Sequence, residues 1–257
     1  MKNKILLLLF ALMLIGCFLI KKKPTIIKTK QNSITFTEPF VKNGELVEHT
    51  YYKLQYSEPH EQAYWVAYKL TPEFLKGNTK RSNRFKSDPL IATKSASLKD
   101  YKHSGYDRGH LAPAGSMTIN SIAMNESFYM SNMSPQEASF NRGIWKKLES
   151  QVRTWSYDSD SLFVVTGPVL KNIEKSIGAN KVSVPKQFYK VLLRFKDSTV
   201  SSIGFLLDNT ASTATLRSKA VAIDEIEEIS GVDFNAGLSE ALQNKIEGNL
   251  YLSDWEF

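Results

Sequence analysis

Near its middle the 257-residue chain reads Gly105-Tyr106-Asp107-Arg108-Gly109-His110-Leu111-Ala112-Pro113-Ala114, and the interpretation of the rest works outward from this stretch. Positions 107–110 hold an acid, a base, a glycine and an imidazole in succession. The imidazole of His110 can take a proton from water near neutral pH, because the unperturbed pKa of histidine is about 6.5. The guanidinium of Arg108 can hold a phosphate through two parallel hydrogen bonds. A lone histidine would be read as a solvated side chain in an ordinary turn, but this combination indicates a site.

A second segment, Tyr129 to Glu149, strengthens that interpretation. Asn141 and Glu149 are eight positions apart, about two turns of a helix, so both can face one site. The carbonyl oxygen of Asn141 is a suitable ligand for Mg²⁺. Asn141 could instead cap a helix, and Glu149 could pair with Lys146 or Arg153 at helical spacing. Their joint occurrence after the histidine motif favours a site.

These strings resemble the DNA/RNA non-specific endonuclease family, relatives of endonuclease G within the ββα-metal (His-Me finger) superfamily. Residues 107–110 match the family's Asp-Arg-Gly-His motif in full. Residues 131–136 match its Ser-Asn-hydrophobic-Ser/Thr-Pro-Gln motif, and residues 145–149 match Trp-x-x-Leu-Glu. Weaker similarity extends over roughly residues 50 to 250.

The resemblance implies a one-metal hydrolysis of phosphodiester bonds in DNA and RNA, with little sequence specificity. It makes His110 the general base and Asn141 the ligand of Mg²⁺, or alternatively of Mn²⁺. Glu149 and Asn132 are carried over with the catalytic residues, Glu149 to orient metal waters and Asn132 to shape the site. Arg108 would neutralise charge on the phosphate.

A further phosphate-binding arginine is expected in the basic loop Lys76–Pro89, where Arg81 and Arg84 compete for the role and Arg81 is favoured. Asp107 is expected to hold the backbone or Arg108. The family's products carry a 5′-phosphate and a 3′-hydroxyl, and its members are often dimers, so a homodimer is compatible with the resemblance.

Composition limits the function classes. The chain has a net charge of +7 and a pI of about 9.2, which suits a polyanionic partner. Hydrophobic residues make up 42%, enough for a folded core. The single cysteine, Cys17, excludes an internal disulfide and a cysteine-based zinc site.

The amino terminus has the pattern of an export signal. Lysines at positions 2 and 4 precede an uncharged run over residues 5–20, which is short for a membrane span. Leu14-Ile15-Gly16-Cys17 resembles a lipobox, which would attach lipid to Cys17; an uncleaved membrane anchor is the alternative. Both place the protein outside the cytoplasm. We expect residues 1–23 to be signal or anchor, residues 24–45 a tether and residues 46–257 the nuclease domain.

The pattern of expected strands and helices predicts an α+β fold. The resemblance implies that its mixed, largely antiparallel sheet carries a ββα-metal motif. Strands are expected at residues 51–56, 63–70, 161–166, 188–195 and 200–207. Helices are expected at residues 139–157, 220–229 and 238–246, and a loop at residues 76–89.

Two other functions remain open at this stage. A non-catalytic, basic nucleic-acid-binding lipoprotein would keep the arginines but does not need His110 or Asn141. A phosphodiesterase of narrower substrate range would keep all of these residues.

Overall fold

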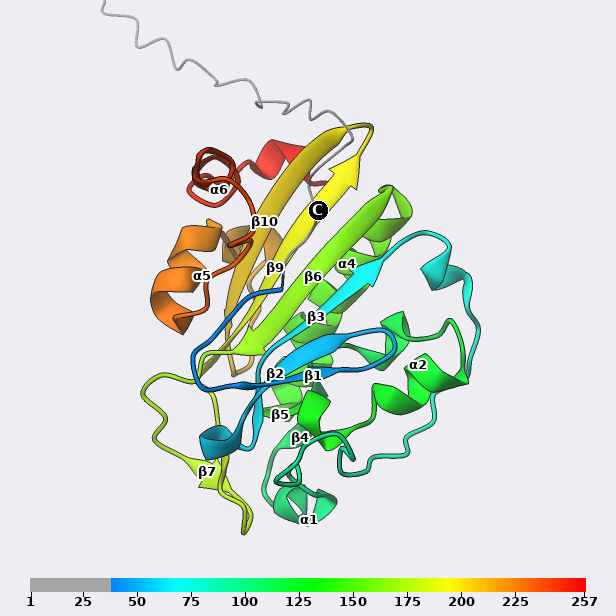
Figure 1. Cartoon of the computed structure of the whole chain (residues 1–257), viewed down its shortest axis with the longest axis vertical. Helices are drawn as coiled ribbons and strands as arrows, with labels where there is room; N and C mark the ends of the chain where they lie inside the picture. The colour runs from blue at the N-terminus through cyan, green and yellow to red at the C-terminus, as the bar shows by residue number, and fades with distance from the viewer. Residues whose placement is uncertain (1–37) are drawn as a thin grey trace, which may run out of the picture.

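A seven-stranded sheet forms the centre of the computed structural model, which describes residues 38–257 (Figure 1). Neighbouring strands in it are antiparallel throughout, where a mixed, largely antiparallel sheet was expected. In spatial order the strands are β1 (Glu45–Glu48), β2 (Lys53–Ser57), β3 (Gln62–Leu70), β6 (Ser161–Pro168), β9 (Gln187–Lys196), β10 (Thr199–Asp208) and β11 (Ala220–Val221).

The longest strands, β9 and β10, form a hairpin closed by Asp197 and Ser198. Both residues have positive φ, 48° and 63°, as a two-residue turn of type I′ requires. This turn twists in the same sense as the strands, and it fixes the register in which Lys196 opposes Thr199.

Helices cover both faces of the sheet. On one face α4 (Lys146–Tyr157) packs Leu148, Val152 and Trp155 into the larger hydrophobic core. On the other, α5 (Ile223–Ser230) packs against a second core that includes Trp65. The sheet is therefore a buried central layer, and in Figure 1 α4 and α5 lie on opposite sides of it.

The segment between the adjacent strands β3 and β6 carries a β-β-α unit. β4 (Asp107–His110) pairs antiparallel with β5 (Met133–Gln136), and a helical segment then leads into α4. This is the ββα arrangement that the sequence predicted. The remaining elements are α1 (Leu98–Tyr101), α2 (Ser121–Glu126), α3 (Ala138–Phe140), β7 (Ser176–Ile177), β8 (Val182–Ser183), α6 (Glu240–Ile246) and 3₁₀ turns at Glu58–His60, Phe74–Lys76, Ala114–Ser116, Met130–Asn132, Leu216–Lys219 and Leu252–Asp254.

All three predicted helices differ in detail. The helix expected at 139–157 consists of α3, a π-helical turn over Asn141–Trp145, and α4. The helix expected at 220–229 begins at Ile223, because Ala220–Val221 pairs with β10 as the edge strand instead. The last helix, α6, begins two residues later than predicted.

The amino-terminal predictions fall mostly outside the described residues. Those for residues 1–23, including Cys17, lie outside them altogether. Of the predicted tether, residues 38–45 lie on the domain: the backbone N–H of Val41 donates to the Gln55 side chain at 2.8 Å, and Phe40 forms a β-bridge with Asp233. Within residues 38–257, no helix has the length and apolar character needed to cross a membrane.

The contact between α4 and the sheet predicts a large loss of stability for Phe205→Ala. Phe205 is fully buried and stacks on Trp155 with ring centroids 5.9 Å apart. Its removal should cost about 3–5 kcal/mol in the free energy of unfolding, measured by urea titration. The matched control is Ile122→Ala, at a side chain that is 52% exposed, which should stay within about 0.5 kcal/mol. A loss below about 1 kcal/mol for Phe205→Ala, roughly the value of one buried methylene group, would show that this contact contributes little to stability.

Candidate active site

The hairpin of β4 and β5 positions the central motif. His110 lies opposite Met133, and the backbone N–H of Leu111 donates to the Asn132 carbonyl at 3.0 Å. The Asn132 side chain is buried and bonds only to backbone: Nδ2 donates to Ala112 O and Ser127 O at 2.9 and 2.8 Å, while Oδ1 accepts from Ala112 N at 2.8 Å. Asn132 therefore holds the loop after His110 in place, a structural role of the kind expected for it, and it does not itself line the cavity described below.

Asp107 connects the hairpin to the helical segment. Its carboxylate accepts hydrogen bonds from Asn141 Nδ2 at 2.9 Å and from Arg142 Nε and Nη2 at 2.9 and 2.7 Å. These bonds keep the pKa of Asp107 below its ordinary value, although partial burial acts to raise it. The expectation that Asp107 holds backbone or Arg108 is thus replaced by a link to Asn141 and Arg142. Because Nδ2 is bound to Asp107, the Oδ1 of Asn141 is the atom left to accept a bond from a ligand.

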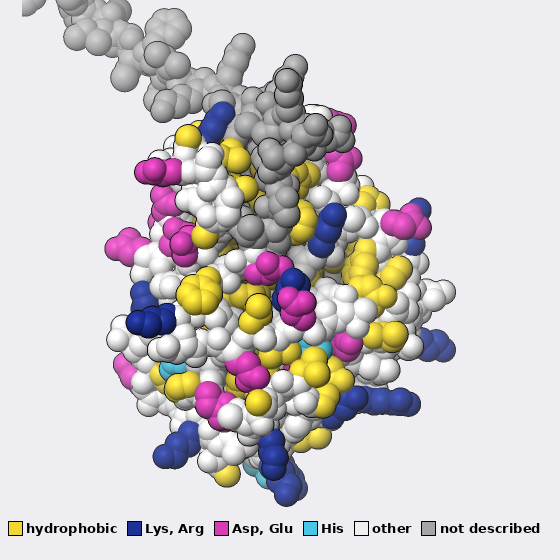
Figure 2. All heavy atoms as spheres, viewed as in Figure 1, with side chains coloured by type: hydrophobic (Ala, Val, Ile, Leu, Met, Phe, Trp, Pro, Cys, Tyr) yellow, Lys and Arg dark blue, Asp and Glu magenta, His cyan; other side chains and the backbone are white. Residues whose placement is uncertain are grey.

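A cavity of about 260 Å³ opens beside this link. Its charged side chains are five basic residues and one acid, Glu149. On the face of the molecule drawn in Figure 2, by contrast, acidic and basic side chains are interspersed. The lining residues are Arg81, Arg108, His110, Pro113, Ala114, Gly115, Asn141, Arg142, Lys146, Glu149 and Arg153. A local excess of positive charge of this kind suits a phosphate group.

The cavity brings together most of the residues predicted for the site. Arg81, Arg108, His110, Asn141 and Glu149 all line it, whereas Arg84 and Asn132 do not. The π-helical turn does not separate Asn141 from Glu149, so the inference that both face one site agrees with their placement. Their chemical roles stay predictions.

His110 is held as a neutral imidazole. It is 7% exposed, and its Nε2 has no hydrogen-bond partner within residues 38–257. Burial, followed by the charges of Arg81 and Arg108, lowers its pKa to about 3. At neutral pH the ring therefore carries a free lone pair and can accept a proton.

Two phenylalanines that the sequence did not single out shape this environment. The ring of Phe128 meets His110 edge-on at 4.9 Å, and Phe85 lies 5.8 Å away. Arg81 lies over Phe128 at 4.9 Å, and Arg108 lies over Phe85 at 4.2 Å. Such cation–π contacts hold the guanidinium groups beside the imidazole without neutralising them.

Glu149 is influenced by a lysine that the sequence analysis missed. Burial raises the pKa of Glu149, and Lys190 is foremost among the cations that oppose the shift. Lys190 is fully buried; its Nζ donates to Thr166 Oγ1 at 3.0 Å and lies 4.5 Å from the Trp145 ring. Burial lowers its pKa, and Glu149 acts against this. A lysine within the apolar strand 188–195 was the signal available in the sequence.

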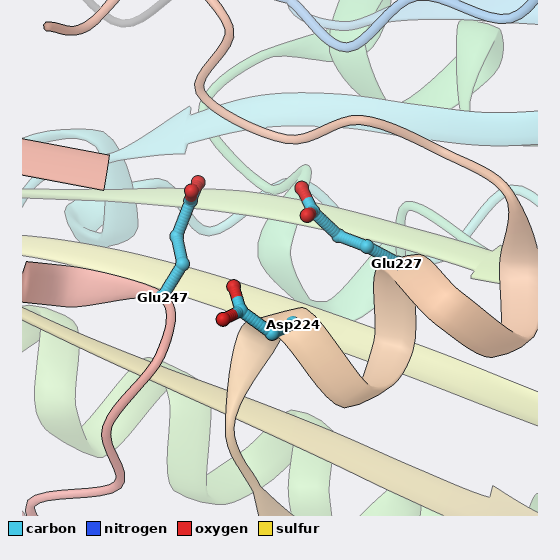
Figure 3. Close-up of side chains that lie close together, drawn as sticks. All are labelled: Asp224, Glu227 and Glu247. Atoms are coloured by element: carbon cyan, nitrogen blue, oxygen red, sulfur yellow. The ribbon is translucent and has the colours of Figure 1, made fainter. Parts of the chain in front are cut away.

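The cavity fits a divalent ion that keeps most of its water. Within residues 38–257, the one group of three acid, histidine or cysteine side chains with ligand atoms within 4.8 Å of one another is Asp224, Glu227 and Glu247, on α5 and after α6 (Figure 3). None of them is a predicted site residue. The cavity instead offers the oxygens of Asn141 and Glu149, a small, hard donor set of the kind Mg²⁺ takes.

Comparison with known proteins assigns the chain to a family. The sequence profile of the DNA/RNA non-specific endonucleases matches residues 31–241. The chain belongs to that family. It is therefore a nuclease, a hydrolase with nucleic acid as its substrate class.

Relatives of this endonuclease support the assignment. It is 34% identical to nuclease C1 of Cunninghamella echinulata var. echinulata over 207 residues, 74% of this chain and 82% of that protein. It is 32% identical to mitochondrial endonuclease G of Caenorhabditis elegans over 226 residues, 77% of this chain and 73% of that protein. Among solved structures, the complex of EndoG with EndoGI matches with a TM-score of 0.72 and 32% identity, over 78% of this chain and 89% of that chain.

The link through Asp107 predicts that Asp107→Asn lowers kcat/KM on DNA by about 10- to 100-fold, the range typical when a ligand side chain loses its support. A neutral amide cannot satisfy both Asn141 and Arg142. The matched control is Asp233→Asn, at an exposed acid on the α5 side of the molecule, which should leave activity unchanged. Equal activity in the two variants would refute the orienting role of Asp107.

The environment of His110 predicts an imidazole that stays neutral well below pH 6.5, as followed by NMR titration. Arg81→Ala should raise its pKa, because a nearby positive charge is removed, whereas Arg84→Ala should leave it unchanged. Between about pH 6.5 and the folded value near 3, the unfolded chain binds a proton here that the folded chain does not. This residue therefore makes the protein less stable as the pH falls through that window. Titration at the ordinary histidine pKa would contradict the assignment.

Proposed function

We propose that this endonuclease hydrolyses phosphodiester bonds of DNA and RNA with little sequence preference, using His110 as general base and a divalent metal ion at Asn141. The observation that carries the proposal is the cavity itself. It places an uncharged imidazole, the Oδ1 of Asn141 and five cations around one space.

His110 acts on the attacking water. Its neutral imidazole accepts a proton as the water oxygen forms a bond to phosphorus. The bond from phosphorus to the 3′ oxygen breaks and that oxygen takes a proton from a water molecule, which leaves a 5′-phosphate and a 3′-hydroxyl. A bound phosphate partly offsets the charges of Arg81 and Arg108, so substrate binding raises the pKa of His110 and makes it a stronger base.

Arg108 and Arg81 stabilise the transition state. Their guanidinium groups flank His110, where negative charge on the phosphate increases during attack. They are aligned before substrate arrives, because each rests on an aromatic ring. Little reorganisation is then required at the moment of reaction.

Asn141 would hold the metal through Oδ1, in the orientation set by Asp107, and Glu149 would orient its water ligands. When bound, Mg²⁺ or Mn²⁺ supplies Lewis-acid stabilisation of the phosphate and the departing oxygen.

The lack of sequence preference follows from what the cavity contacts. Arginine and lysine side chains bind the phosphate backbone, which all sequences share. Affinity should accordingly fall as salt rises. With membership of a nuclease family shown, the non-catalytic alternative has no remaining support; a narrower phosphodiesterase stays the competing function.

We further infer that the protein works outside the cytoplasm, held at a membrane through Cys17 or through the apolar run 5–20. The support is the sequence pattern of residues 1–23. A homodimer would be consistent with the family resemblance.

The mechanism predicts that His110→Ala and Asn141→Ala each reduce cleavage of plasmid DNA and of RNA by about 10²- to 10⁴-fold. Cleavage by the wild-type chain should cease on removal of divalent metal with EDTA and return with Mg²⁺. The matched control is His103→Asn, at an exposed histidine with φ of 59°, a conformation that asparagine tolerates.

Cleavage that survives His110→Ala would exclude this residue as the base. Cleavage of only one nucleic acid would favour the narrower phosphodiesterase.

A further inference from the structure

Two other cavities adjoin the active-site cavity through shared residues. One, of about 340 Å³, lies beside α1 and shares Arg108 with it. The other, of about 460 Å³, lies along the exposed side of α4 and shares Arg142 and Lys146 with it. We name them the α1 cavity and the α4 cavity. Further hollows therefore adjoin the active-site cavity at Arg108 and at Arg142 and Lys146.

The α4 cavity has the chemistry of a phosphate track. Its charged residues are Arg142, Lys146 and Lys147, with no acid among the residues that line it. Lys147 is exposed, and no ion pair engages it within the described part of the chain. Its charge is therefore available to a polyanion.

The α1 cavity is of a different kind. Its charged residues are Lys102, Arg108 and the acid Asp107, which is already hydrogen-bonded to Asn141 and Arg142. Tyr101 and Tyr106 also line it, and aromatic rings of this kind can pack against bases. The Tyr101 hydroxyl is buried, in a residue only 6% exposed, and has no hydrogen-bond partner among the described residues. A buried hydroxyl without a partner is costly, and a base that entered this cavity could supply one after a small shift of the ring.

We propose that the nucleotides flanking the cleaved bond occupy these two cavities, with a base in the α1 cavity and phosphates along the α4 cavity. The proposal rests on the proposed function, since it places the scissile phosphate beside His110. A strand held on both sides keeps that phosphate in position for attack, which a single phosphate contact would not do. A non-specific enzyme can position the phosphate in this way if it contacts the backbone and stacks on or hydrogen-bonds to one base without distinguishing which base it is.

Binding tests the track separately from catalysis. The full chain carrying His110→Ala is titrated in EDTA with a fluorescent single-stranded oligonucleotide over a range of salt concentrations. Lys102 lies at the α1 cavity, where it would contact the phosphate of the nucleotide whose base enters that cavity. Adding Lys102→Ala or Lys147→Ala should weaken binding and reduce the slope of log K against log salt by about 0.7, the loss of one phosphate contact on a single strand. The matched control is Lys99→Ala, an exposed lysine on α1 that does not line the cavity.

Tyr101→Phe tests the base position. Because the hydroxyl has no partner among residues 38–257, its removal should leave the melting temperature unchanged or slightly higher. Affinity for the oligonucleotide should fall about threefold to tenfold, the loss of one hydrogen bond, but affinity for an abasic strand of the same length should not change.

The outcomes separate the two proposals. If Lys102→Ala and Lys147→Ala bind with the same affinity and salt slope as Lys99→Ala, the track is wrong, whatever the nuclease activity. If Tyr101→Phe is destabilised, or loses equal affinity for normal and abasic strands, the base position is wrong. If the variants behave as expected while the wild-type chain cuts nothing, the track stands and the proposed mechanism fails.

Discussion

The carboxylate of Asp107 is the contact on which the site depends. It joins a strand of the β4–β5 hairpin to a helical segment more than thirty positions later, by accepting hydrogen bonds from Asn141 and from Arg142. This orients an amide whose two ends have similar shape but opposite hydrogen-bonding character. Asp107 is one of two acids near the cavity, and its charge is already paired with Arg142. Glu149 is the acid that lines the cavity itself. Orientation and charge are thus set by the same side chain.

The resulting cavity has an excess of positive charge that a bound anion would offset. Five cations line it against a single carboxylate, and a sixth, Lys190, lies buried behind Trp145. Like charges held together and a lysine removed from water both oppose folding. The same arrangement depresses the pKa of His110 and favours a bound anion. The clustered cations therefore lower the stability of the fold at the place where the reaction needs positive potential. Perturbed charged groups of this kind are common at functional sites.

Much of the fold could be predicted because its signals are local. Alternating and apolar runs identified the five long strands, and Leu148, Val152 and Trp155 identified the buried face of α4. The remainder depends on contacts between distant segments. Arg81 lines the cavity and rests on Phe128, whereas Arg84 does not line it, and the local sequence could not distinguish the two. Hydrogen bonds to two backbone segments hold the Asn132 side chain away from the cavity. The edge strand that shortens α5 likewise requires β10 as its partner.

The topology has a consequence for how the protein acquires activity. Val66 on β3 pairs with Thr166 on β6, and the segment between these strands carries the complete histidine motif, the Asp107 link and Glu149. Closing so long a loop makes this pairing a slow step in folding. A chain still emerging from the ribosome would hold every one of those residues before β6 exists to complete the sheet beneath them. The nuclease should therefore stay dormant during its own synthesis, and its activation coincides with the arrival of the carboxy-terminal half.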